Sequence, residues 1–75
     1  MICYLIKTDE KQQRRFYNMH LLPTLFGDWS LVREWGRLDY GVTVRFDSFP
    51  SEKAALDELD TIKSSKLKGG YCLLQ

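Results

Sequence analysis

The spacing of the apolar side chains changes once along this chain of 75 residues, at Pro50. Before Pro50, strand-forming residues gather in four segments, over residues 2–7, 15–22, 29–37 and 42–48. In the last three segments the side chains alternate between two faces, which is typical of a β-strand. After Pro50, apolar residues recur at intervals of three and four, which is typical of one face of a helix. The sequence therefore predicts four strands followed by a single helix.

The predicted helix covers residues 51–67. Ser51 is a good N-cap residue, and an acidic Glu52 in the first turn suits the helix dipole. The apolar stripe of this helix consists of Ala55, Leu56, Leu59 and Ile62. Gly69 and Gly70 are expected to end the helix in the left-handed conformation.

These elements predict an α+β fold: an antiparallel sheet of about four strands with the C-terminal helix packed on one face, in a single domain over residues 1–75. Residues 8–13 are wholly polar and are expected to form a loop. Pro23 is expected to end the second strand, because proline has no N–H to donate to a strand ladder. The apolar tail at residues 71–74 either adds a strand or packs beneath the helix.

The formal net charge is +1, from eleven basic and ten acidic residues, which does not by itself announce a nucleic-acid-binding protein. Basic residues predominate in segments 11–45 and 61–75, whereas acidic residues gather in 46–60. The folded chain can therefore present one basic face. No apolar run is long enough for a transmembrane helix, and the first residues lack the features of a signal peptide. We expect a cytoplasmic protein with no membrane partner.

The residues of ordinary catalytic and metal sites are sparse. Cys3 and Cys72 lie in apolar neighbourhoods near the two ends and are expected to be buried and reduced. His20 is the only histidine, and its spacing from the cysteines fits no zinc site. Ser30 lacks the flanking glycines of a nucleophile elbow, and no glycine-rich phosphate loop is present. We expect no enzymatic activity, no small-molecule substrate, no metal and no cofactor.

The unusual feature is Trp35-Gly36-Arg37 at the end of the third predicted strand. Trp35 and Arg37 project to the same face, and Arg33 joins them two residues earlier. Gly36 leaves room for close backbone approach on the other face. An indole between two guanidinium groups suits a nucleic acid, because indole stacks on bases and arginine forks onto phosphates. The alternative is a core tryptophan with arginines that extend past it to solvent.

The stretch LPTLFGDWSLVREWGR at residues 22–37, with VRFDSFPSE at 44–52 and KGGY at 68–71, resembles the WGR domain. The resemblance covers residues 4–71 and is greatest to the compact bacterial form. In DNA-dependent poly(ADP-ribose) polymerases the same domain binds the end of a broken DNA strand. The resemblance implies that Trp35 packs against a terminal nucleotide and that Arg37 contacts DNA or a neighbouring domain. Arg14 falls near a position that helps to hold the 5′ end.

One departure from the family pattern follows the motif, where Asp39 stands in place of a common glycine and places a negative charge beside Arg37.

Two functions follow from these observations. The first is a nucleic-acid-binding module, for DNA and strand ends above all, with Trp35 and Arg37 at the centre of its surface and Arg33 and Arg14 at the edge. The alternative is a protein-interaction module that docks a partner on the sheet face left open by the helix, with the same tryptophan as an anchor. Salt dependence separates the two, because only phosphate neutralisation makes binding fall steeply with added salt. The sequence leaves the oligomeric state open.

Overall fold

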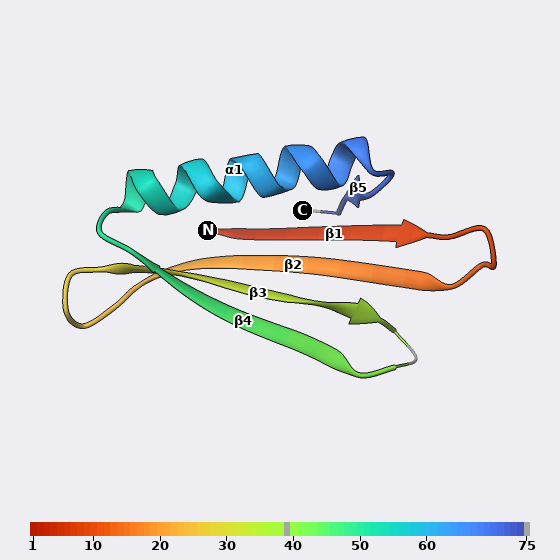
Figure 1. The fold of residues 1–75 in the computed structure, drawn as a ribbon, viewed down its shortest axis with the longest axis horizontal. Helices are drawn as coiled ribbons and strands as arrows, with labels where there is room; N and C mark the ends of the chain where they lie inside the picture. Colours follow the sequence, from red (N-terminus) through yellow and green to blue (C-terminus); the bar gives the residue numbers. More distant parts are fainter. Residues whose placement is uncertain (39, 75) are drawn as a thin grey trace.

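A computed structural model describes residues 1–38 and 40–74. Its elements are β1 (Ile2–Thr8), β2 (Arg14–Pro23), β3 (Trp29–Arg37), β4 (Val42–Phe49), α1 (Glu52–Lys68) and β5 (Cys72–Leu73) (Figure 1). The strands form one antiparallel sheet in the order β4-β3-β2-β1-β5. The predicted α+β fold is confirmed, and the sheet has one strand more than the four expected.

The additional strand settles what the apolar tail does. Leu73 pairs with Leu5 and Cys72 with Ile6, so β5 lies at the edge of the sheet beside β1. The N–H of Leu74 also donates to the carbonyl of Tyr4 at 2.8 Å. Of the two outcomes that the sequence leaves open, the tail therefore adds a strand.

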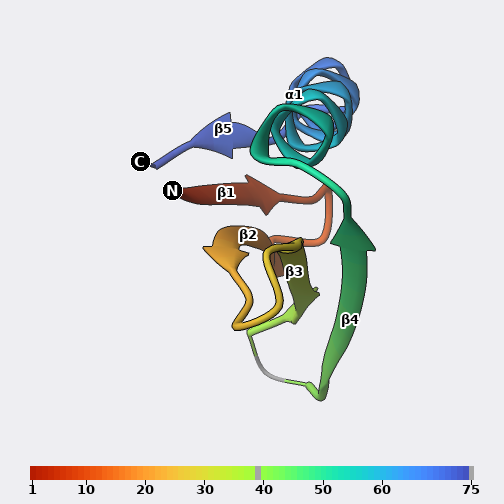
Figure 2. The same ribbon diagram turned by 90° about the vertical axis from the view of Figure 1, so that its left-hand side faces the viewer.

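The core lies between α1 and one face of the sheet, here called the helix face (Figure 2). Leu5, Met19 and Leu31 come from three adjacent strands, and all three are fully buried. From α1, Ala55 and Leu59 are fully buried, and Leu56 and Ile62 pack partly buried against the same cluster. The predicted helical stripe is therefore the face that α1 buries.

The structure confirms the predicted N-cap of α1 but not the predicted conformation at its C-terminal end. The Ser51 hydroxyl accepts the Ala54 N–H at 3.1 Å, as expected of an N-cap. At the other end, the expectation of a left-handed Gly69 is wrong, since its φ is −82°. Its N–H still bonds to the carbonyls of Ser65 and Lys66, so the last turn continues through it. The chain reverses at Gly70, whose φ is +99°.

The two cysteines differ in exposure, so the expectation of two buried thiols holds only for Cys3. Cys72 is exposed because it lies on the short edge strand β5, opposite Ile6. Both cysteines are free. The strand register also places Cys72 three residues from the position opposite Cys3. Within the described part of the chain, no helix is both long and apolar enough to cross a bilayer.

Candidate nucleic-acid interface

Strand register aligns three cations across the helix face. Lys7 on β1 lies opposite Arg15 on β2, and Arg15 lies opposite Arg37 on β3. We call these three residues the cation row. Like charges directly opposite each other on neighbouring strands destabilise a sheet. This end of the sheet therefore carries a positive charge that its own pairing does not favour.

Each member of the cation row is held differently. The Lys7 Nζ donates to the carbonyl of Gly69 at 2.6 Å, which ties the row to the end of α1. The Arg37 Nη1 donates to the Gln13 Oε1 at 2.6 Å, and its guanidinium carbon lies 4.1 Å from the Tyr40 ring centroid. These partners are neutral, so they orient the two cations without cancelling their charge.

Arg15 forms an ion pair with Asp9, in which the Arg15 Nε lies 3.6 Å from the Asp9 Oδ2. The Arg15 side chain is nevertheless 50% exposed. Asp9 accepts the backbone N–H groups of Gln13 and Lys11, both at 2.9 Å. These bonds, that from Gln13 foremost, lower the pKa of Asp9. Asp9 therefore orders the polar loop between β1 and β2 and neutralises part of the charge of the cation row.

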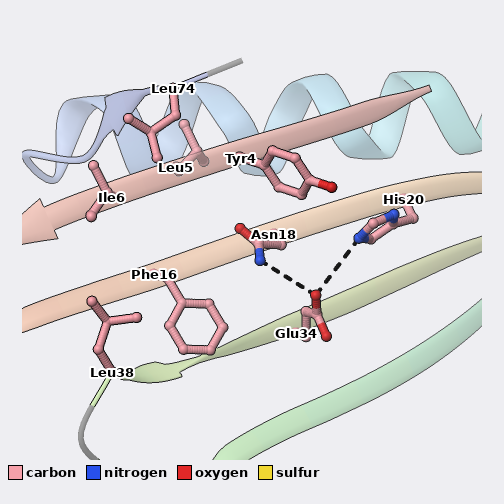
Figure 3. A pocket seen from close by; sticks show the side chains of 9 residues that line it. All are labelled: Tyr4, Leu5, Ile6, Phe16, Asn18, His20, Glu34, Leu38 and Leu74. Carbon is pink, nitrogen blue, oxygen red and sulfur yellow. Dashed lines mark hydrogen bonds and ion pairs between the residues drawn. The ribbon is translucent and has the colours of Figure 1, made fainter.

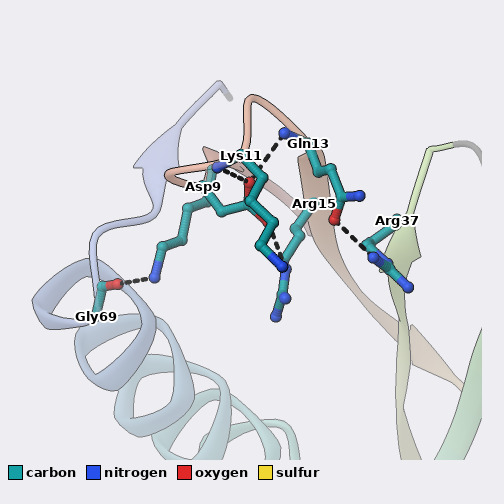
Figure 4. Close-up of polar contacts among 7 residues, drawn as sticks. Asp9, Lys11, Gln13, Arg15, Arg37 and Gly69 are labelled. Atoms are coloured by element: carbon teal, nitrogen blue, oxygen red, sulfur yellow. Dashed lines mark hydrogen bonds and ion pairs between the residues drawn. The ribbon is translucent and has the colours of Figure 1, made fainter.

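The cation row borders a hollow of about 510 Å³ at this end of the molecule. Figure 4 shows the polar contacts of Asp9, Arg15 and Arg37 at this end. Cationic and polar side chains predominate in the lining of the hollow, which comprises Lys7, Thr8, Asp9, Glu10, Lys11, Gln13, Arg15 and Arg37. The hollow is polar and open to solvent, and it suits an anionic ligand better than an apolar one.

An aromatic row lies next to the cation row on the same face. Tyr17 on β2 pairs with Trp35 on β3, and their rings stack with centroids 5.5 Å apart and planes 17° from parallel. Tyr71 meets the Tyr17 ring edge-on at 6.5 Å, and the Lys66 Nζ lies 4.6 Å from the Tyr17 centroid. Trp35 is half-buried and packs against the core. The tryptophan is therefore fixed on its inner side and partly exposed on its outer side.

Arg33 lies on the same face but is engaged by protein groups. Its Nη2 donates to the Asp47 Oδ2 at 2.7 Å, and its Nη1 donates to the Tyr17 hydroxyl at 3.4 Å. Only 16% of the Arg33 side chain is exposed. The hydrogen bond from Arg33 lowers the pKa of Asp47, which Arg45 also approaches at 3.1 Å. Arg33 therefore braces β3 against β4 and the aromatic row.

The backbone packing explains why position 36 is a glycine. A Cβ on Gly36 would come within 2.6 Å of the Gly41 carbonyl oxygen, a separation that real Cβ atoms essentially never show. The close backbone approach that the sequence predicts here does occur, and the approaching backbone belongs to the turn that leads into β4. Glycine at this motif position lets β4 lie against β3.

The structure places the predicted site residues on two sides of the sheet. Trp35, Arg37 and Arg33 share the helix face, as strand alternation requires. Arg14 precedes Arg15 on β2, so alternation directs its side chain to the opposite side. The idea that the tryptophan anchors a partner on the uncovered side of the sheet is wrong, because Trp35 stacks on buried Tyr17 beneath α1. Asp39 lies outside the described residues.

The sequence does not single out Lys7, Arg15 or Lys66 as members of this surface. Lys7 and Arg15 belong to segments that are predicted as strands, and alternation alone assigns each a face. Their alignment with Arg37 depends on which strands are neighbours and in which register. Two successive hairpins set that register, one turning at the polar loop and the other at residues 24–28.

Taken together, the fold and this surface define a small α+β binding module with a basic and aromatic face. The chain belongs to the WGR family, since residues 1–74 match the WGR domain model, and WGR domains are small binding modules associated with nucleic acids.

One relative is the uncharacterized protein y4dW of Sinorhizobium fredii, which is 33% identical over 61 residues, 81% of this chain. The match spans 30% of that protein's length. No solved structure matches the chain.

Proposed function

We propose that this chain binds DNA through the cation row and the outer edge of Trp35. The observation that carries the proposal is the alignment of Lys7, Arg15 and Arg37 on three adjacent strands. The mutual repulsion in such a row is relieved when an anion binds against it. Asp9 neutralises part of the charge of the cation row, and a bound phosphate backbone neutralises the remainder.

The arrangement suits the chemistry of a nucleotide. Arg15 and Arg37 each offer a planar fork of N–H donors, and such forks match phosphate oxygens. Trp35 lies in the adjacent row, held by its stack on Tyr17, and its outer side is available to a base or a sugar. Arg33, which Asp47 already holds, also bonds to Tyr17, on which Trp35 stacks, and so supports the platform rather than binding the ligand. The site therefore combines a phosphate-binding edge with an aromatic platform.

The resemblance to the WGR domain of the polymerases extends the proposal to strand ends. A terminal nucleotide can present a base face to Trp35 and a phosphate to the cation row together, whereas an internal base pair is stacked on both sides. Binding is therefore expected to favour DNA that has free ends.

A titration of three DNA forms tests this function. Linear, nicked and covalently closed circular DNA of one sequence are titrated with the chain at low salt, and binding is followed by electrophoretic mobility and competition. We expect the linear and nicked forms to compete better than the closed circle. Equal competition by all three would overturn the preference for ends, and no binding to any form would overturn DNA binding itself.

The role of Trp35 is tested in the same titration. Trp35→Ala removes a stack worth about 1–3 kcal/mol per base, so binding to linear DNA should weaken by one to two orders of magnitude. Because Trp35 also packs against the core, Trp35→Phe serves as the companion variant and is expected to keep the fold with a smaller loss of affinity. Full affinity in a folded Trp35→Ala variant would remove the tryptophan from the site.

A further inference from the structure

The side of the sheet opposite the helix face, here called the open face, is largely apolar. Its side chains include Tyr4, Ile6, Phe16, Val32, Val44 and Phe46, at alternating strand positions. Phe46 is 70% exposed and Val44 is 48% exposed. Within residues 1–38 and 40–74, α1 covers the other face and no element covers this one (Figure 2). Contiguous exposed apolar surface of this kind marks an interaction site on a soluble protein.

The open face is also hollowed. A pocket of about 470 Å³ lies over β1 and β2, and its rim includes Tyr4, Phe16, Leu38 and Leu74 (Figure 3). Leu74 reaches this rim because β5 extends the sheet beside β1. Glu34 from β3 borders the same pocket, and the close-up shows its carboxylate beside Asn18 and His20 (Figure 3). Among the described residues that line it, the pocket therefore has an apolar rim and one acidic group, which lies beside two polar side chains.

The Glu34 carboxylate is only partly satisfied by neighbouring side chains. Its Oε1 accepts a hydrogen bond from the Asn18 Nδ2 at 3.3 Å and lies 3.7 Å from the His20 Nε2. No lysine or arginine among the described residues forms an ion pair with it. About a third of the Glu34 side chain is exposed, namely 36%. A partly exposed carboxylate without a lysine or arginine partner gains most from a ligand that brings a cation as it excludes water.

This charge distinguishes between the possible occupants of the face. A second copy of the chain would bring the same apolar side chains and a second carboxylate at the centre of the contact. The arginine on the same side of the sheet, Arg14, lies at the end of β2, and His20 already faces the Glu34 of its own chain. A different protein that carries a lysine or arginine among apolar residues satisfies both features of the face.

We propose that the open face docks a segment of another protein in which one basic side chain lies among apolar ones, with the basic group on Glu34. The segment's apolar side chains fill the hollow at Phe16 and Leu74 and cover Phe46. The open face and the cation row lie on opposite sides of one sheet, so DNA and this partner occupy different surfaces. The module then joins a nucleic acid to a protein.

A displayed library of random 12-residue peptides tests the chemistry of the partner. The library is selected on the wild-type chain and counter-selected on Phe46→Ser, a change at a largely exposed position. We expect the enriched peptides to share one lysine or arginine flanked by at least two apolar residues. Enrichment of peptides without a basic residue, or no enrichment over the counter-selection, would overturn the proposal.

The best peptide is then titrated into the labelled full chain and followed by NMR. Amide shifts are expected at Asn18, Val32 and Val44 and not along α1. Glu34→Gln should weaken this peptide about 10-fold, the value of one charged hydrogen bond, and should not weaken a peptide in which norleucine replaces the basic residue. Equal weakening of both peptides, or shifts confined to the helix face, would contradict the assignment of Glu34.

Sedimentation of the unliganded chain checks the competing occupant. We expect a monomer at NMR concentrations, for both the wild type and Phe46→Ser. A wild-type dimer that Phe46→Ser dissociates would show that a second copy covers the open face, and would overturn the proposal. Failure of any of these experiments leaves DNA binding untouched, because Glu34 and Phe46 lie away from the cation row.

Discussion

At the scale of single residues, the WGR motif combines a packing constraint with a binding chemistry. Gly36 is required by the backbone of the next turn, whereas Trp35 and Arg37 present side chains to the helix face. Strand alternation predicts from sequence that Trp35, Arg37 and Arg33 share a face. It does not predict that Asp47 holds Arg33 or that Gln13 holds Arg37, because those partners come from other strands and loops whose register is set by the whole sheet.

The close approach at Gly36 predicts a loss of stability on Gly36→Ala. The added methyl group would meet the Gly41 carbonyl oxygen, and such overpacking costs about 1–3 kcal/mol. Gly41→Ala is the matched control, since a Cβ there meets nothing within 4 Å. Urea unfolding of the two variants and the wild type measures the difference. Equal free energies of unfolding for Gly36→Ala and the wild type would show that the turn yields without cost.

The Arg33–Asp47 pair predicts a pH dependence of stability. Hydrogen bonding from Arg33 lowers the pKa of Asp47 in the folded chain, so the pair stabilises the fold above the unfolded pKa of about 3.9. That contribution is lost as the pH falls through the lowered folded pKa. Asp47→Asn should therefore be less stable than the wild type at pH 7, and the difference should shrink as the wild type is acidified. A difference in the free energy of unfolding that stays constant from pH 7 to pH 2 would contradict this.

At the scale of elements, the four main strands and the helix follow from patterns within short segments. The three-four stripe predicts which side of α1 is buried, and the structure confirms it at Ala55 and Leu59. The tail could not be assigned from sequence, because an apolar stretch of four residues fits either a strand or a packed coil. Pairing with β1 decides it. The end of α1 could not be assigned to one glycine either, since Gly69 and Gly70 are adjacent and equally able to adopt positive φ.

The burial of α1 predicts that Leu59→Ala costs about 2–5 kcal/mol, because it leaves a cavity under a fully buried side chain. Leu67→Ala makes the same change on the same helix at a position that is 41% exposed, and its effect should stay within about 0.5 kcal/mol. Thermal and urea unfolding compare the two variants. Similar losses in both would mean that helix propensity, rather than packing of the stripe, holds α1 on the sheet.

The edge position of β5 predicts different reactivity for the two thiols. Cys72 is exposed and should react with an aromatic disulfide reagent in the native protein. Burial raises the pKa of the Cys3 thiol and also blocks access to it, so Cys3 should react only on unfolding. The number of protein thiols that react is measured with and without denaturant, from the aromatic thiolate that the reagent releases. Cys72→Ser identifies the reactive group. Rapid native reaction of Cys72→Ser would show that the core around Cys3 opens readily.

At the scale of the whole molecule, one sheet separates two surfaces of different chemistry. The helix face carries the cation row and the aromatic row at one end, and the open face is apolar with a single carboxylate inside its hollow. The near-zero net charge of the chain conceals this division, because it averages the cation row with the acidic residues elsewhere in the chain. Composition therefore underestimates how basic the candidate site is, and strand register reveals it.

The salt dependence of binding to a short linear duplex tests the central claim most directly. Affinities of the wild type, Arg15→Ala, Arg37→Ala and Arg14→Ala are measured from 50 to 200 mM salt. Each lost phosphate contact lowers the slope of log K against log salt by about 0.9, so Arg15→Ala and Arg37→Ala should each flatten the dependence by that amount. Arg14→Ala removes the same charge on the opposite side of the sheet and should change the slope far less. If Arg14→Ala flattens the dependence as much as Arg15→Ala, or if neither Arg15→Ala nor Arg37→Ala alters it, DNA does not bind at the cation row.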